Sequence, residues 1–273
     1  MAEKTQANNN SPVFLITGCS TGFGREIAIA ALASDFRVIA TARRAETVSD
    51  LEKRGAKTLA IAIYGQVDYL VNNAGYAQGG AIEEVTPGEA LAQFNTNFFG
   101  LVNTTNAFLP HLRSRRAGTL VNISSEVTCT GLPGAGIYAA SKAAITAVSD
   151  TWANELKEYG IRSICVLPGQ FRTQFLKNAG VFGRPSTMVD GYEVLHGAMR
   201  HMANGDFSTA IRGDPTKAAR NIVTVVTRAE VPLHFVVGED SFVSFKAFYE
   251  KRLEEMKALH DLSTGTNFDE AAL

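Results

Sequence analysis

The chain has 273 residues, 45% of them hydrophobic, and a formal net charge of −1. The balanced charge leaves no field that would attract nucleic acid, and no run approaches the roughly 18 apolar residues of a membrane span. Three cysteines and five histidines show no metal-ligand spacing, so we expect no metal and a reduced, cytoplasmic protein.

Short apolar runs alternate with helical stretches along the chain, which predicts an α/β fold with a doubly wound, Rossmann-like parallel sheet. Strands are expected at residues 13–16, 37–41, 69–71, 120–123, 162–167 and 233–237. Helices are expected at residues 24–33, 44–54, 87–115, 137–158, 215–227 and 242–259, with a kink or break at Pro110. We predict one domain over residues 12–260, between flexible tails at residues 1–11 and 261–273.

A glycine-rich turn joins the first strand to the first helix and reads Thr17-Gly18-Cys19-Ser20-Thr21-Gly22-Phe23-Gly24. In a dinucleotide-binding turn, Gly18 permits the tight bend, Gly22 lets the backbone approach the pyrophosphate, and Gly24 allows close packing of helix on strand. The N-terminus of the helix offers free N–H groups to phosphates. The spacing differs from GxGxxG, so a packing turn without a ligand stays open.

The end of the second strand indicates which dinucleotide is bound. NAD-preferring folds carry an acidic residue there for the ribose 2′-hydroxyl, whereas this chain has Arg43 and Arg44. A guanidinium can bind a 2′-phosphate through two hydrogen bonds. The sequence therefore predicts NADP(H) in preference to NAD(H), with two exposed surface arginines as the alternative.

Tyr138 and Lys142 stand four residues apart, on one face of a predicted helix. A nearby ammonium lowers the pKa of a tyrosine, which is otherwise too high for a base at neutral pH. Ser125 follows a predicted strand and is therefore expected at the carboxyl edge of the sheet, where its hydroxyl can polarise a carbonyl. Each residue alone has a packing explanation, but the combination favours an acid/base site.

These motifs, in this order, resemble those of the classical short-chain dehydrogenase/reductase family over about residues 13–238. Besides the glycine turn and the Ser125–Tyr138–Lys142 set, the matching motifs are Asn72-Asn73-Ala74-Gly75, Asn97, and Pro168-Gly169 with Thr173. The resemblance implies an oxidoreductase that interconverts a carbonyl and a secondary alcohol by hydride transfer, with the tyrosine as acid/base.

The resemblance also implies which residues form the site. The catalytic group would be Asn97, Ser125, Tyr138 and Lys142, with Asn97 holding a water of the proton relay. The cofactor would contact Gly18, Ser20, Thr21, Gly22, Phe23, Gly24, Arg43, Arg44, Asn73, Ala74, Gly75, Tyr138, Lys142, Pro168, Gly169 and Thr173. Family members usually assemble through the helices that correspond to residues 87–112 and 137–158, which implies a homodimer or homotetramer.

The segment before the Asn-Asn-Ala-Gly motif is shorter than the family pattern, which has a third strand and a further helix there. If residues 58–61 were that strand, only residues 62–66 would remain for a parallel crossover that needs about 10–12. We therefore predict that the edge strand is lost or irregular, that residues 45–66 form one shortened crossover, and that part of one sheet face is bare. The family's acidic adenine contact has no counterpart here. A sequence that lacks a piece is the alternative explanation.

Residues 174–212 are expected to form a lid over the substrate cleft, opposite the loop at residues 130–134. The lid's apolar side chains favour a hydrophobic carbonyl or alcohol as the substrate, with ordinary packing as the alternative: Phe175, Leu176, Val181, Phe182, Met188, Tyr192, Leu195 and Met199. Two other functions stay open. One is a catalytically impaired or silent dinucleotide-binding protein of this fold, and the other is a methyltransferase, which leaves the tyrosine–lysine pair unexplained.

Overall fold

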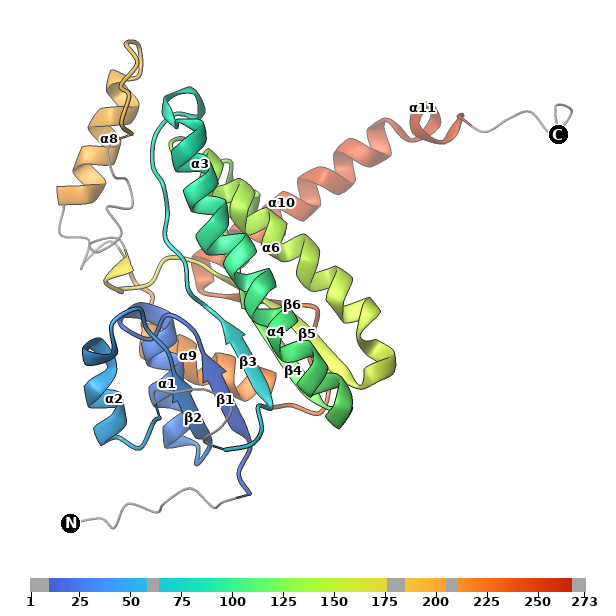
Figure 1. The fold of residues 1–273 in the computed structure, drawn as a ribbon. Coiled ribbons are helices and arrows are strands. Elements are labelled where there is room, and N and C mark those ends of the chain that lie inside the picture. The colour runs from blue at the N-terminus through green and yellow to red at the C-terminus, as the bar shows by residue number, and fades with distance from the viewer. Residues whose placement is uncertain (1–9, 58–63, 176–184, 205–210, 267–273) are drawn as a thin grey trace, which may run out of the picture.

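The computed structural model describes residues 10–57, 64–175, 185–204 and 211–266. Within them a six-stranded sheet has the order β2-β1-β3-β4-β5-β6, and every neighbouring pair is parallel (Figure 1). The strands are β1 (Val13–Ile16), β2 (Arg37–Ala40), β3 (Tyr69–Asn72), β4 (Gly118–Ile123), β5 (Ile161–Pro168) and β6 (His234–Val237). The prediction of a doubly wound α/β fold is confirmed.

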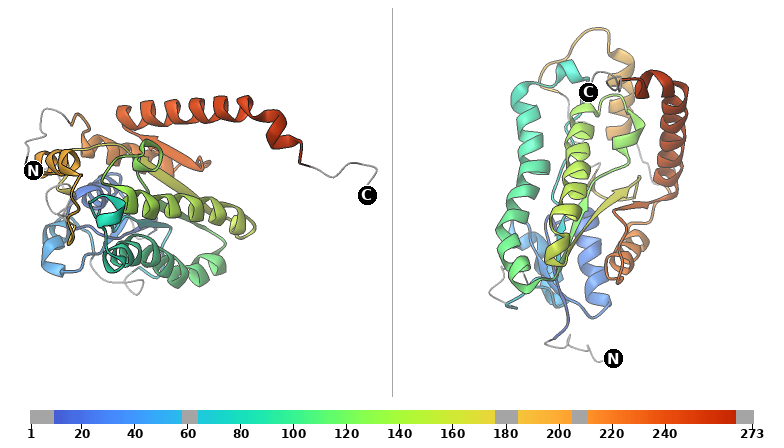
Figure 2. Two further views of the ribbon diagram at one scale, coloured as in Figure 1. Left: turned by 90° about the horizontal axis from the view of Figure 1, so that it is seen from above. Right: turned by 90° about the vertical axis from the view of Figure 1, so that its right-hand side faces the viewer.

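Helices cover both faces of the sheet, as the right-hand view of Figure 2 shows. Those that form the two main layers are α1 (Gly22–Ala33) and α9 (Pro215–Val226) on one face, and α4 (Gly100–Arg115) and α6 (Gly136–Glu155) on the other. Alternate residues of a strand point to opposite faces, so Phe14 packs in the first layer and Leu15 in the second. Both layers meet the sheet through buried side chains.

The remaining helical elements are shorter or lie at the ends of the sheet. They are η1 (Ala45–Val48), α2 (Ser49–Lys53), η3 (Ile82–Glu84), α3 (Pro87–Phe94), η4 (Asn95–Phe99), α5 (Val127–Thr130), η5 (Lys157–Tyr159), α8 (Glu193–Asn204), α10 (Glu239–Ala258) and α11 (His260–Thr264). The helix α10 runs away from the body of the molecule (Figure 2), and α11 continues it past residue 260. Residues 267–273 of the expected tail lie outside the described residues.

Two expected helices differ from the structure in an informative way. The first helix begins at Gly22 and not at Gly24, so the second glycine of the turn is already helical. The stretch expected as one helix over residues 87–115 is divided by the π-helix η4, and Pro110 stays inside α4 without ending it. Pro110 is exposed, so the carbonyl that it leaves unpaired one turn earlier can face water.

The shortened crossover is confirmed in the described residues. The only pairing beyond β2 that they contain is an isolated bridge between Ile39 and Lys57, closed by hydrogen bonds from Lys57 N to Val38 O and from Ala40 N to Lys57 O, both 2.8 Å. Residues 58–63 lie outside the described residues. The chain then enters β3, which pairs directly with β1. Within the described residues, Lys57 is therefore the one residue that pairs beyond β2.

The end of this crossover is fixed by side chains. Val67 N donates to His111 Nε2 (3.2 Å), and Arg115 donates to Val67 O (2.7 Å). The guanidinium of Arg37 lies 4.9 Å from the centre of the Tyr64 ring. Contacts of this kind give a short crossover one defined path into β3.

The expectation of a bare sheet face is wrong for the strands nearest the edge. Val13 and Ile39 are 0% exposed and Leu15 is 4% exposed on the α4 and α6 side of the sheet. Tyr64 packs against this cluster, and a single aromatic side chain can cover apolar area that a helix would otherwise cover.

Candidate active site

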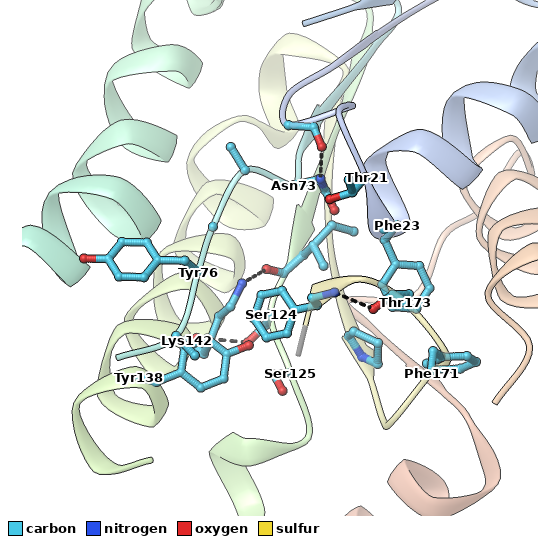
Figure 3. A pocket seen from close by; sticks show the side chains of 18 of the residues that line it. Thr21, Phe23, Asn73, Tyr76, Ser124, Ser125, Tyr138, Lys142, Phe171 and Thr173 are labelled. Carbon is cyan, nitrogen blue, oxygen red and sulfur yellow. Dashed lines mark hydrogen bonds between the residues drawn. The ribbon is translucent and has the colours of Figure 1, made fainter. Parts of the chain in front are cut away.

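A cavity of about 1200 Å³ opens at the carboxyl ends of the strands. This is where open α/β sheets bind ligands. All of the predicted site residues are described, and all of them except Gly24 and Asn97 line this cavity. Side chains from the start of α1, from the segments that follow β3, β4 and β5, and from α6 converge there (Figure 3). The structure thus brings the glycine turn and the Ser125–Tyr138–Lys142 set to one cavity.

The glycine turn has the geometry that a phosphate-binding turn requires. Gly18 and Gly22 have φ values of +71° and +64°, which side chains rarely tolerate. A Cβ on Gly24 would overlap Asn73 Nδ2 and lie 2.7 Å from Gly18 O. Gly24 therefore serves packing and not ligand contact, in agreement with its absence from the cavity wall.

Asn73 fastens this turn to the end of β3. Its Nδ2 donates to Thr17 O (2.9 Å) and Gly18 O (3.3 Å), and Thr17 Oγ1 accepts from Asn73 N and Ala74 N at 3.0 Å. The N-cap of α1, Thr21, makes no side-chain capping bond. The first N–H groups of α1 therefore face the cavity without a capping acceptor, and the turn fits the pyrophosphate of a dinucleotide.

Arg43 and Arg44 lie after β2 and line the same cavity with exposed side chains. Arg44 is 3.9 Å from the carboxylate of Glu46, and both of these side chains are about three-quarters exposed. Exposed pairs at this distance contribute little energy, so the guanidinium can turn to another anion.

Lys142 is buried and donates from Nζ to Ile123 O (2.7 Å), while Nζ lies 5.8 Å from the centre of the Tyr138 ring. Burial lowers the pKa of Lys142 to about 8. Burial also raises the pKa of Tyr138 to about 12, opposed by a hydrogen bond with Ser125. The expected lowering of the Tyr138 pKa by Lys142 is therefore wrong for this structure, because desolvation of the phenol is the dominant effect.

Two adjacent serines, Ser124 and Ser125, follow β4, and the structure gives them different surroundings. Ser124 is 2% exposed, donates to Lys142 O (2.9 Å) and contacts Thr146 Oγ1 (2.9 Å). Ser125 is less buried, its Oγ accepts from Val127 N (3.3 Å), and its side chain lies toward Tyr138 at the cavity wall, which Ser124 also lines. Ser124 supports the helix that carries Lys142, and Ser125 is the hydroxyl available to a ligand.

Asn97 occupies the π-helix η4 and is 0% exposed. Its Nδ2 donates to Tyr76 O (2.9 Å) and Ser141 Oγ (3.0 Å), and its Oδ1 accepts from Tyr76 N (3.0 Å). Both amide hydrogens are thus engaged by protein atoms. The side chain holds the segment after β3 against α6, and its role in a proton relay stays a prediction.

The loop after β5 carries Pro168 and Gly169, both in the cavity wall. Asp240, at the start of α10, accepts from Gln170 N (2.6 Å), and a Cβ on Gly169 would overlap this carboxylate. Thr173 also lines the cavity and lies close to Gly22. The loop predicted to meet the nicotinamide end is therefore fixed by the N-terminus of α10.

Several wall residues were not found from the sequence. Glu126, next to Ser125, lines the cavity, and burial together with the charge of Asp240 raises its pKa to about 7, opposed by Gln170. Tyr76 and Phe171 also line it. Their positions directly after the Gly75 and Pro168-Gly169 motifs were the available signal, because chain that continues past a strand end borders the same cleft.

The lid itself stays a prediction, and some of its expected residues lie at or near the cavity. Phe175 lines the cavity, with its ring 6.1 Å from that of Tyr138, and Leu132 of the opposite loop also lines it. Met199 is 4% exposed, whereas Met188 is 48% exposed. Lid residues outside the described part of the chain are Leu176, Val181 and Phe182.

The described residues contain no group of three or more His, Cys, Asp or Glu side chains that could hold a metal ion. No helix among them has both the length and the apolar composition that crossing a membrane requires.

The comparisons with known proteins agree with this site. The family model described as short chain dehydrogenase matches residues 56–181. A 3-ketodihydrosphingosine reductase of Bacteroides thetaiotaomicron is 36% identical over 181 residues, 62% of this chain and 67% of that protein. The uncharacterised oxidoreductase YusZ of Bacillus subtilis is 33% identical over 259 residues, 84% of this chain and 90% of that protein.

A crystal structure of a short-chain dehydrogenase from Streptomyces avermitilis superimposes with a TM-score of 0.81 at 33% identity, covering 95% of this chain and 99% of that one. The chain therefore belongs to the short-chain dehydrogenase family, whose members are oxidoreductases that use nicotinamide dinucleotide cofactors.

Proposed function

We propose that this protein is an NADP(H)-dependent oxidoreductase that interconverts a carbonyl and a secondary alcohol on a hydrophobic small molecule. The observation that carries the proposal is the convergence of Ser125 and Tyr138 with the glycine turn on one cavity. Proximity of an acid/base group to a bound dinucleotide is what hydride transfer requires of a protein.

In this proposal the cofactor's pyrophosphate lies on the turn from Gly18 to Gly22 and the first N–H groups of α1. Arg43 and Arg44 bind the 2′-phosphate, while Thr173 and its loop hold the nicotinamide end. When bound, NADPH supplies the hydride and NADP+ accepts it. The uncapped helix end and the absence of a Cβ at Gly18 and Gly22 support this placement.

Tyr138 acts as the acid when a carbonyl is reduced. With a pKa of about 12, the residue is a phenol at neutral pH and has a proton to give to the developing alkoxide. Ser125 donates a hydrogen bond to the same oxygen. Oxidation of an alcohol needs the phenolate, which a pKa of about 12 makes scarce at neutral pH.

Lys142 positions the cofactor and supports Tyr138. An ammonium has three donors, and Ile123 O takes one of them. The other two are available to a ribose hydroxyl and to the Tyr138 side. With a pKa of about 8, Lys142 is mostly charged at neutral pH.

The substrate end of the cavity is apolar, which supports a hydrophobic substrate. Its apolar wall comprises Val127, Leu132, Ala135, Phe171, Phe175 and Ile211. One relative is named as a reductase of a keto compound, 3-ketodihydrosphingosine, which supports carbonyl reduction as the reaction type. A homodimer or homotetramer, assembled through the helices at residues 87–112 and 137–158, is part of this proposal.

The test is a screen for NADPH oxidation, followed at 340 nm, over hydrophobic ketones and aldehydes. We expect turnover of at least one class, with NADPH used in preference to NADH and no turnover by the Tyr138→Phe variant. NADPH binding without turnover of any carbonyl compound or alcohol would instead establish a catalytically silent binding protein.

A further inference from the structure

The segment at residues 75–81, which we call the cavity-wall segment, leaves β3 and borders the cavity. It is extended but has no strand beside it, so its backbone groups need other partners. Three buried side chains supply them: Asn97, Gln93 and Glu84 each accept a hydrogen bond from a backbone N–H of this segment. The wall of the cavity is thus fixed by side chains and not by a sheet.

Glu84 differs from the other two because it also binds a distant part of the chain. Its Oε2 accepts from Ala81 N (2.9 Å), and its Oε1 accepts from Val189 N (2.9 Å) and contacts His196 Nε2 (2.6 Å). Val189 and His196 lie 105 and 112 residues further along the chain. A local helix cap would account for Ala81 only.

A carboxylate suits this position for a physical reason. Glu84 is 0% exposed, and a buried carboxylate is costly unless donors surround it. Burial alone would raise its pKa, but hydrogen bonds from Val189, Ala81 and His196 hold the pKa below its usual value. Three N–H donors meet two acceptor oxygens. A glutamine would offer one acceptor oxygen and turn its own N–H₂ toward a donor.

The partner of Glu84 is the described part of the expected lid, residues 185–201, which we call the lid segment. Two further polar contacts of this segment with the body are exposed: Tyr192 OH donates to Glu83 (2.5 Å), and Ser186 N donates to Glu89 (3.0 Å). Exposed contacts of this kind hold a segment weakly. The buried contact at Glu84 is the strong one.

The lid segment lies at the substrate end of the cavity. Leu195 and Met199 of α8 pack against the backbone of Gly134. The neighbours of Gly134, Leu132 and Ala135, line the cavity. Figure 1 shows α8 beyond the carboxyl ends of the strands. A shift of the lid segment would therefore change the loop that faces the substrate and leave the glycine turn in place.

We propose that Glu84 is a positioning residue for the substrate: it fastens the lid segment to the cavity-wall segment through His196 and Val189, and so sets substrate affinity without touching the reacting atoms. This inference rests on the proposed function. It adds to that function a specific connection between the cavity-wall segment, which lines the cavity, and the lid segment, which packs on the loop around Gly134.

The test compares Glu84→Gln with Glu83→Gln, the same change at the exposed neighbouring residue that also contacts the lid segment. Backbone hydrogen exchange at residues 186–196, NADPH affinity, and kcat and KM for a carbonyl substrate are measured for each. For Glu84→Gln we expect exchange at least about tenfold faster and KM at least about tenfold higher, with kcat and NADPH affinity within about threefold of wild type. Glu83→Gln should behave as wild type.

Two variants of His196 keep the proposal testable if Glu84→Gln does not fold. His196→Gln retains an N–H donor for Glu84 and should stay near wild type, whereas His196→Phe should reproduce the faster exchange and raised KM. Equal behaviour of these two, unchanged exchange in Glu84→Gln, or a tenfold loss of NADPH affinity in it would each overturn the proposal. If the wild type turns over no carbonyl compound, the proposed function fails, while the exchange comparison still decides whether Glu84 holds the lid segment.

Discussion

The Nζ of Lys142 donates a hydrogen bond to the carbonyl oxygen of Ile123 at 2.7 Å. Ile123 is the last residue of β4, so the ammonium is held against the strand that leads to Ser125. Burial is the largest cause of the raised Tyr138 pKa in this structure. The burial of Lys142 itself has a consequence for the stability of the fold.

The burial of Lys142 predicts how stability changes with pH. Its pKa falls from 10.5 in the unfolded chain to about 8 in the folded one, so between these values the unfolded chain binds more protons and stability rises with pH. At about 1.4 kcal/mol per pKa unit, the contribution amounts to about 3 kcal/mol, unfavourable below pH 8 and gone by pH 10.5.

The measurement is urea unfolding of the cofactor-free wild type and Lys142→Met from pH 7 to pH 10.5. The wild type should gain about 3 kcal/mol relative to the variant over this range. Lys251→Met, at an exposed position of α10, controls for the loss of a charge. A wild-type-to-variant difference that stays constant with pH would contradict the prediction.

Tyr138→Phe tests the acid. The change removes the hydroxyl and leaves the ring that packs beside Phe175. General acid catalysis contributes about 10²–10⁴-fold to the rate. The kcat of this variant should therefore fall by at least about 10²-fold, while NADPH affinity stays within about threefold. Single-turnover kinetics and a calorimetric titration give the two quantities. Wild-type turnover in this variant would remove Tyr138 from the mechanism.

Mutations of Ser124 and Ser125, the two serines that follow β4, should have different effects on activity and stability. Ser125→Ala removes the hydroxyl that faces the cavity and should lower kcat by about 10²-fold with little loss of stability. Ser124→Ala breaks the buried bonds to Lys142 O and Thr146. It should cost about 1 kcal/mol in unfolding free energy and change kcat by less than about fivefold. The opposite pattern would exchange their roles.

The predicted preference for NADPH over NADH depends on Arg43 and Arg44. Hydrogen bonds to a charged group contribute about 1.5–3 kcal/mol, so Arg43→Ala or Arg44→Ala should weaken NADPH binding by about 10- to 100-fold. NADH, which lacks the 2′-phosphate, should bind each variant as it binds wild type. Arg54→Ala, in the turn after α2 and outside the cavity wall, is the control. Parallel losses for NADPH and NADH would show that neither arginine recognises the phosphate.

The sequence predicts those parts of the site that depend on local chain geometry. The glycine turn, Tyr138 and Lys142 four residues apart, and Ser125 at a strand end all follow from short-range patterns, and the structure places them together. The two-layer α/β architecture likewise follows from alternating apolar runs and helices.

What the sequence did not predict depends on contacts between distant residues. Glu84 and His196 are separated by 112 positions, and no spacing rule joins them. The pKa of Tyr138 depends on the burial that its neighbours create. The π-helix η4 arises where Asn97 turns inward to bind the cavity-wall segment, and helix periodicity carries no signal for that choice.

Gly24 offers a test of the turn that does not depend on activity. A Cβ there would overlap Asn73 Nδ2, which holds the turn through Thr17 O and Gly18 O, so Gly24→Ala should destabilise the fold by about 1–3 kcal/mol. NADPH affinity should fall with it, because the turn can no longer close on β3. Gly88→Ala is the matched control, since its Cβ would meet open space inside α3 and should stabilise by up to about 1 kcal/mol. The measurements are the denaturant midpoint and the NADPH affinity of each variant. Equal midpoints for the two variants would mean that the close packing at Gly24 does not contribute to the stability of the fold.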